Sequence, residues 1–76
     1  MEKYLNKSRD SGVIGYEIGE DYIDIIFNNR LAYRYSYFSA GKENVEKMKL
    51  LAKNGDGLNS FINQYCKFKY LKKYKI

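Results

Sequence analysis

The chain has 76 residues, a net charge of +5, one cysteine and no histidine. This length allows one domain with one core, and the composition excludes an internal disulfide and any site that needs histidine. No apolar run approaches the ~20 residues of a membrane helix, and residues 1–10 are too charged for a signal peptide. We therefore expect a cytoplasmic protein, bacterial or viral, that does not bind membranes.

Three segments in the first half of the chain alternate apolar and polar residues, which is the pattern of half-buried strands. The expected strands are 13–18, 22–27 and 31–38. A three-residue loop at 28–30 pairs Ile23 with Tyr35 and Ile25 with Tyr33, which brings the apolar positions of both strands onto one face. We expect a type I turn whose last residue, Arg30, is left-handed.

Apolar residues recur at helical spacing beyond Ser39, which is the expected N-cap of a first helix ending near Gly55. A second helix is expected to begin near Leu58, with Asn59 as its cap. The residues beyond Tyr65 fit either a continued helix or a strand. The predicted fold is α+β, a three-stranded antiparallel meander followed by two helices packed on one face.

The net positive charge of the chain comes from its last ten residues. Five of the fourteen Lys and Arg residues, and none of the nine acids, lie in residues 67–76, so residues 1–66 are formally neutral. We expect a single domain at 1–66 and a basic aromatic tail at 67–76. Lysines interleaved with rings suit a polyanion, because ammonium groups meet phosphates while rings stack on bases. Solubility, or packing of the rings against the domain or another subunit, stays open as an alternative.

Several short segments together resemble a known family. They are Ile14-Gly15-Tyr16, the strand at 23–27, Tyr33-Arg34-Tyr35 and the segment 55–62. In this order they are similar to the KTSC domain, a small module named for its occurrence at the C-terminus of some lysyl-tRNA synthetases. The resemblance implies the fold more firmly than any function, which for that family is a proposal of RNA binding. The chain departs from the family at two places. Arg30 stands where the family has glycine, and the family's Val-Pro before the first helix is absent.

The leading hypothesis is a non-enzymatic module that binds RNA or another polyanion without a cofactor. Basic groups would contact phosphates and tyrosines would stack on bases. The candidate residues are Arg30, Arg34, Tyr35, Tyr37, Lys67, Lys69, Tyr70, Lys72, Lys73 and Lys75. Core packing is the alternative for Tyr33 and Tyr35, and a solvated ion pair with Asp24 is the alternative for Arg34.

The outer face of the predicted sheet supports a competing hypothesis. Tyr22, Ile26 and Phe38 share that face and are too apolar for a surface that meets only water. They are candidate interface residues for a homo-oligomer or a protein target. In this interpretation the chain is a small viral-type inhibitor that oligomerises and sequesters a host protein or a signalling nucleotide.

Catalytic and metal sites find no support in the sequence. Cys66 has no histidine to act as its base, and the segment 55–59 lacks the lysine and hydroxyl of a P-loop. The carboxylates around the first hairpin match no ligand pattern. We therefore expect neither a catalytic residue nor a bound metal.

Overall fold

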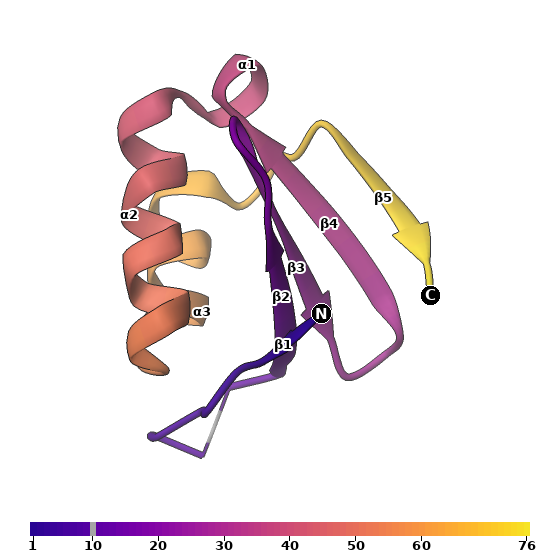
Figure 1. Ribbon diagram of the computed structural model, residues 1–76, viewed down its shortest axis with the longest axis vertical. Coiled ribbons are helices and arrows are strands. Elements are labelled where there is room, and N and C mark those ends of the chain that lie inside the picture. Colours follow the sequence, from indigo (N-terminus) through magenta and orange to yellow (C-terminus); the bar gives the residue numbers. More distant parts are fainter. Residues whose placement is uncertain (10) are drawn as a thin grey trace.

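The computed structural model describes residues 1–9 and 11–76 as one antiparallel sheet with helices over one of its faces (Figure 1). Neighbouring strands in the sheet follow chain order: β1 (Glu2–Lys3), β2 (Val13–Ile18), β3 (Tyr22–Phe27), β4 (Leu31–Ser36) and β5 (Lys72–Lys75). The connection from β4 to β5 contains α1 (Tyr37–Ala40), α2 (Lys42–Asn54), α3 (Leu58–Phe61) and the π-helix η1 (Ile62–Cys66). Within the described residues, every helix is too short or too polar to cross a bilayer.

The expected three-stranded meander followed by two helices is wrong, although the α+β class is right. The described part of the sheet has five strands, because β1 joins the edge of β2 and β5 joins the free edge of β4. An edge strand is held by main-chain hydrogen bonds and tolerates exposed lysines. The sequence Lys-Lys-Tyr-Lys of β5 therefore carries no apolar alternation that could identify it.

The β3–β4 hairpin has the predicted register. Ile23 pairs with Tyr35 and Ile25 with Tyr33, which confirms the three-residue loop. Arg30 is left-handed, with φ 66°, and its N–H donates to the carbonyl of Phe27 at 3.0 Å. A non-glycine residue in this conformation costs about 1 kcal/mol, so Arg30 destabilises the turn relative to glycine.

The end of β4 differs from the prediction of a strand to residue 38. Ser36 ends the strand because it caps α1. Its hydroxyl accepts from the N–H of Ser39 at 3.0 Å, while the Ser39 hydroxyl accepts from the N–H of Ser36 at 3.1 Å. This reciprocal capping box makes Ser36 the cap of α1 and places Tyr37 and Phe38 in a helix. The expectation that Ser39 caps the helix ending near Gly55 is wrong, because Gly41 occupies the N-cap position of α2.

The later helix boundaries agree better with the sequence. The longest helix, α2, ends at Gly55, whose left-handed φ of 80° supplies the expected stop. The next helix begins at Leu58 as predicted, but Gly57 occupies the N-cap position and no side chain caps it. The expectation that Asn59 caps this helix is therefore wrong, and its amide is left for other contacts.

The core lies between the helices and the sheet. Tyr35 and its neighbours on the inner face of the sheet pack against apolar residues of α2, α3 and η1, and Cys66 is buried among them as a free thiol. The core residues of the helices are Val45, Met48, Ala52, Leu58, Ile62 and Cys66. This packing fixes the position of the helices over the sheet.

The basic tail is attached to the sheet. Before β5 begins, the ring of Tyr70 contacts the rings of Tyr33 and Tyr35, with centroids 5.0 and 6.4 Å apart. Within β5, Tyr74 pairs with Ala32 and its hydroxyl donates to Asp24 at 2.7 Å. For Tyr70 and Tyr74, the interpretation in which the rings pack against the domain is confirmed.

Candidate nucleic-acid interface

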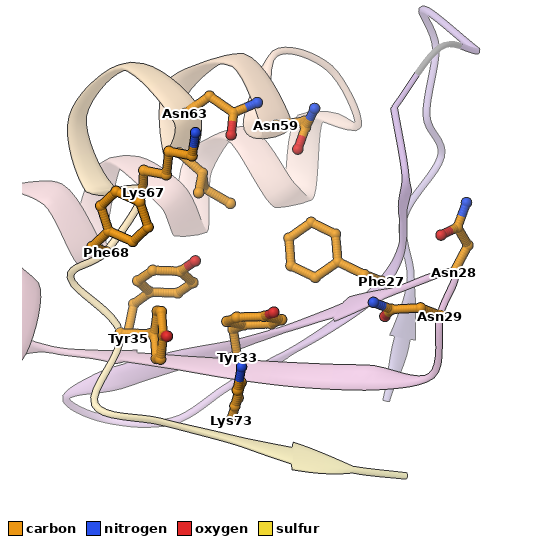
Figure 2. A pocket seen from close by; sticks show the side chains of 12 residues that line it. Phe27, Asn28, Asn29, Tyr33, Tyr35, Asn59, Asn63, Lys67, Phe68 and Lys73 are labelled. Atoms are coloured by element: carbon orange, nitrogen blue, oxygen red, sulfur yellow. The ribbon is translucent and has the colours of Figure 1, made fainter.

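A groove of about 430 Å³ lies between the β3–β4 hairpin, the α3–η1 segment and the chain that leads into β5 (Figure 2). We call it the aromatic groove. Its lining combines aromatic rings, asparagine amides and lysines around one aliphatic side chain, and none of the described residues that line it is acidic. They are Phe27, Asn28, Asn29, Tyr33, Tyr35, Asn59, Ile62, Asn63, Lys67, Phe68, Tyr70 and Lys73.

The sheet side of the groove is a set of rings packed edge to face. The ring of Tyr33 lies at the centre, with Phe27 on one side at 5.3 Å and Tyr70 on another at 5.0 Å between centroids. Their planes are close to perpendicular, at 84° and 90°, which is a favourable arrangement for aromatic quadrupoles. The rings therefore form a firm wall whose shape does not depend on one flexible side chain.

Tyr35 contributes mainly its hydroxyl to the groove. The residue is only 1% exposed, and burial is the largest cause of the raised pKa of its hydroxyl. The group therefore stays protonated at neutral pH and acts as a hydrogen-bond donor as well as an acceptor. For Tyr35 the alternative, in which the ring packs in the core, is confirmed, and no open ring face is left for stacking.

The helix side of the groove presents a polar row. Asn59, Asn63 and Lys67 follow one another at intervals of four residues and project from the α3–η1 segment in Figure 2. The apolar residues one position earlier, such as Ile62 and Cys66, anchor the segment in the core. Residues 62–66 form a π-helix, a geometry that is frequent at functional sites.

Many polar groups of the groove have no hydrogen-bonding partner among residues 1–9 and 11–76. The hydroxyls of Tyr33, Tyr35 and Tyr70 form no hydrogen bond with any described residue, and the same holds for the amide of Asn63. The side-chain amides of Asn28 and Asn59 are equally unpaired within the described chain, whereas Asn29 accepts from the N–H of Leu31. Converging unpaired polar groups among aromatic rings are typical of a small-molecule site.

Two lysines supply the charge of the groove. The ammonium of Lys67 lies 5.5 Å from the ring centroid of Phe68, and that of Lys73 lies 6.0 Å from the centroid of Tyr33. These cation–π contacts are weak at exposed sites. Neither lysine forms an ion pair with a described residue, so both are free to neutralise an anion.

Arg34, a predicted phosphate contact, is engaged elsewhere. Its Nε lies 2.7 Å and its Nη2 2.9 Å from the two carboxylate oxygens of Asp24, and its guanidinium stacks on Tyr22 at 4.0 Å. The hydrogen bonds to Asp24 are the main cause of its raised pKa. The alternative of an ion pair with Asp24 across the two strands is confirmed, but the pair is not solvated, because Asp24 is only 1% exposed. The pair is therefore a partly buried structural element on the outer face.

The other predicted nucleic-acid contacts fall into two sets. Tyr35, Lys67, Tyr70 and Lys73 line the groove. Outside it lie Tyr37, whose hydroxyl donates to Glu46, and the exposed residues Arg30, Lys69, Lys72 and Lys75. The hydrogen bond to Glu46 is the main cause that raises the pKa of Tyr37 to about 12. Its hydroxyl is thereby tied to α2 and not presented to a ligand at the groove.

The candidate interface residues do not form one exposed patch. Ile26 is only 3% exposed and lies in register with Ala32, which in turn pairs with Tyr74 of β5. Tyr22 is partly covered by Arg34. Phe38, at 92% exposed, is the one of the three that stands open. The burial of Ile26 and the stacking of Arg34 on Tyr22 thus remove much of the apolar outer face that the sequence predicted.

Sequence reasoning identified only four of the twelve residues that line the groove. Phe27, Asn28, Asn63 and Phe68 were not candidates, because they come from three separate segments that meet only after folding. One signal was present. The row Asn59, Asn63 and Lys67 has helical spacing and runs beside the apolar stripe that predicted the second helix.

No family model, curated protein or solved structure matches the chain. The resemblance to the KTSC domain therefore gains no support from these comparisons, and function has to be inferred from the groove and its charges.

Proposed function

We propose that the protein is a non-enzymatic module that binds single-stranded nucleic acid at the aromatic groove. The observation that carries this proposal is the composition of the groove: rings, unpaired amides and free lysines, with no acidic residue among its described lining. Rings stack on bases of any sequence, amides hydrogen-bond base edges and lysines neutralise phosphates. A single strand is favoured over a duplex because its bases are free to leave the stack.

The alternation of β5 indicates which lysines act with the groove. Lys73 pairs with Tyr33 and Lys75 with Leu31, so both side chains emerge on the face of the sheet that carries Tyr33. Lys72 pairs with Arg34 and emerges on the opposite face. Together with Lys67, two β5 lysines thus form a basic track beside the rings, long enough for about three phosphates at one phosphate per lysine.

The test is the salt dependence of binding to a fluorescent single-stranded RNA. A triple variant, Lys67→Gln with Lys73→Gln and Lys75→Gln, is expected to lower the slope of log K against log[salt] by about 2, at roughly 0.7 per phosphate. The matched control changes three exposed lysines that do not line the groove, Lys3→Gln with Lys47→Gln and Lys53→Gln. Equal losses in both triple variants would show that net charge alone, and not the groove, drives binding.

We propose RNA rather than DNA as the preferred ligand because of the resemblance to the KTSC domain alone. Membership of that family is itself part of the proposal. The resemblance rests on Tyr33-Arg34-Tyr35 and on residues 55–62, and these segments contribute Tyr33, Tyr35 and Asn59 to the groove. Parallel titrations with ribo- and deoxyribo-oligonucleotides of one sequence test the order. Tighter binding of the deoxyribose strand would reverse it.

A non-enzymatic role is consistent with the chemistry of the described residues. Burial is the main cause of the raised pKa of Cys66, the only thiol, so it is a poor nucleophile. A reduced, unpaired cysteine also suits the cytoplasm, which we propose as the location of the protein.

A second candidate function, sequestration of a free signalling nucleotide, is favoured by the size of the groove. Its volume of about 430 Å³ falls in the lower part of the roughly 300–1,000 Å³ range of small-molecule pockets. Calorimetric titration with nucleoside monophosphates and with oligonucleotides separates the two functions. A mononucleotide that binds more tightly than any oligonucleotide would favour sequestration.

A further inference from the structure

We infer that the aromatic groove holds one nucleobase of a phosphorylated ligand and reads its edge through Tyr35, Asn59 and Asn63. This inference rests on the proposed function and deepens it, because it divides the recognition of bases from the recognition of the phosphate backbone. The chemistry required is a planar heterocycle with hydrogen-bonding groups at its edge and a phosphate nearby.

Stacking surfaces for a single base are present on the rings at the mouth of the groove. Phe68 lines the groove and is 80% exposed, so its ring offers a face that no packing inside the domain uses. Tyr33 is half-buried and fixed by its edge contacts with Phe27 and Tyr70. A ring that is already immobilised loses little entropy when a base stacks on it.

The unpaired polar groups make the groove selective for a heterocycle over an apolar ligand. An apolar ligand would displace water from the hydroxyl of Tyr35 and from the amides of Asn59 and Asn63. These groups would then lose their hydrogen bonds to water and gain none, which lowers the binding affinity. Asparagine presents a donor and an acceptor side by side, an arrangement that matches the edge of a base. Tyr35, buried and protonated, adds a donor in a fixed position.

Charge and volume restrict the ligand further. Lys67 lies on the helix side of the groove and Lys73 on the sheet side (Figure 2). A neutral sugar would stack on the rings but gain nothing from either lysine. With about 430 Å³, the groove takes one nucleotide and not several, since pockets for drug-sized ligands begin at roughly 300 Å³. In a polymer, the neighbouring nucleotides would follow the lysine track outside.

The experiment compares ligands with and without bases on the full-length chain. The probes are an eight-nucleotide RNA, an abasic ribose-phosphate strand of the same length, the four nucleoside monophosphates and inorganic phosphate. We expect the abasic strand to bind at least about tenfold more weakly than the RNA, the loss typical of one stacked base. We also expect the monophosphates to compete for the groove and inorganic phosphate to compete poorly.

Two conservative variants test the reading of the base edge. Tyr35→Phe and Asn63→Ala are each expected to weaken RNA and monophosphate binding about fivefold and to leave binding of the abasic strand unchanged. The matched controls, Tyr65→Phe and Gln64→Ala, change neighbouring side chains on η1 that do not line the groove. Thermal unfolding of each variant verifies that it is folded before binding is compared.

The outcomes separate this inference from the proposed function. If RNA and the abasic strand bind equally, or if the two variants weaken both alike, the base pocket is refuted and the nucleic-acid proposal stands. If oligonucleotides fail to bind while monophosphates bind and respond to Tyr35→Phe and Asn63→Ala, the nucleic-acid proposal falls and the base pocket stands. If none of the base-containing probes binds, both are wrong.

Discussion

The hydroxyl of Tyr74 donates a hydrogen bond to the carboxylate of Asp24, 2.7 Å away in space and 50 residues earlier in the chain. Asp24 lies in β3 and also accepts two hydrogen bonds from Arg34 of β4. One buried carboxylate thereby connects three strands, including β5, which carries three of the five tail lysines. The tail is part of the fold and a candidate binding element at once.

Tyr74→Phe is expected to destabilise the domain by about 1–2 kcal/mol, because it removes a hydrogen bond to a charged and buried acceptor while keeping the ring. Urea denaturation followed by circular dichroism measures the change in the free energy of unfolding. Tyr65→Phe is the control, since its hydroxyl forms no hydrogen bond with a described residue and its side chain is exposed. Equal stability of the two variants would show that the Tyr74 contact contributes nothing.

Alkaline pH tests the same contact in a different way. The hydrogen bond to Asp24 is the main cause that raises the pKa of Tyr74 to about 12, whereas an unfolded chain has a tyrosine pKa of about 10. The folded state holds this proton more tightly, so the stabilisation is fully present below about pH 10 and is lost as the pH rises through the folded pKa. We expect the difference in the free energy of unfolding between wild type and Tyr74→Phe to shrink between pH 9 and pH 12, because unfolding then releases roughly one proton, that of the Tyr74 hydroxyl. A constant difference over that range contradicts this account.

Deletion of residues 67–76 is expected to destabilise or unfold the domain. It removes β5, it takes Tyr70 away from Tyr33 and Tyr35, and it leaves the edge of β4 open. Replacement of the tail lysines by glutamine keeps these contacts and is expected to leave the free energy of unfolding within about 0.5 kcal/mol. Circular dichroism melting curves of both proteins check the contrast. A truncated chain that melts like the wild type would show that the tail is only an appendage.

Arg34→Gln is expected to cost about 3 kcal/mol, because it leaves the carboxylate of Asp24 buried and without its ionic partner. The double variant, Asp24→Asn with Arg34→Gln, removes both charges and is expected to recover part of that loss. A double-mutant cycle in urea measures the coupling free energy of the pair. If the losses in the free energy of unfolding of the two single variants add up to that of the double variant, the pair is not coupled.

Arg30→Gly is expected to stabilise the domain by about 0.5–1 kcal/mol, since glycine adopts the left-handed conformation of this turn without strain. Arg30→Gln removes the charge but keeps the strain, and it is expected to leave stability unchanged. Comparing the RNA affinities of the two variants shows whether this arginine contacts the ligand. A loss of affinity in both would add Arg30 to the basic surface, while unchanged affinity would confine it to the turn.

The amino-acid sequence by itself determined the local elements whose signals lie close together in the chain. Alternation and the parity of a three-residue loop specify the register of β3 and β4, including the left-handed Arg30. Apolar residues at helical spacing specify the start of α3, and Gly55 specifies the end of α2. Ser36 and Ser39 also formed a readable local signal, since a serine pair three residues apart is able to cap a helix, but strand alternation concealed it.

Only the tertiary structure decided the role of the last ten residues and the existence of the aromatic groove. Lys72–Lys75 forms a strand because the edge of β4 offers main-chain hydrogen bonds to it and because the Tyr74 hydroxyl donates to the carboxylate of Asp24. Neither condition is visible in the local pattern, which shows only charge. The groove likewise requires rings and amides from the hairpin, the α3–η1 segment and the tail, and such contacts depend on how the helices pack over the sheet.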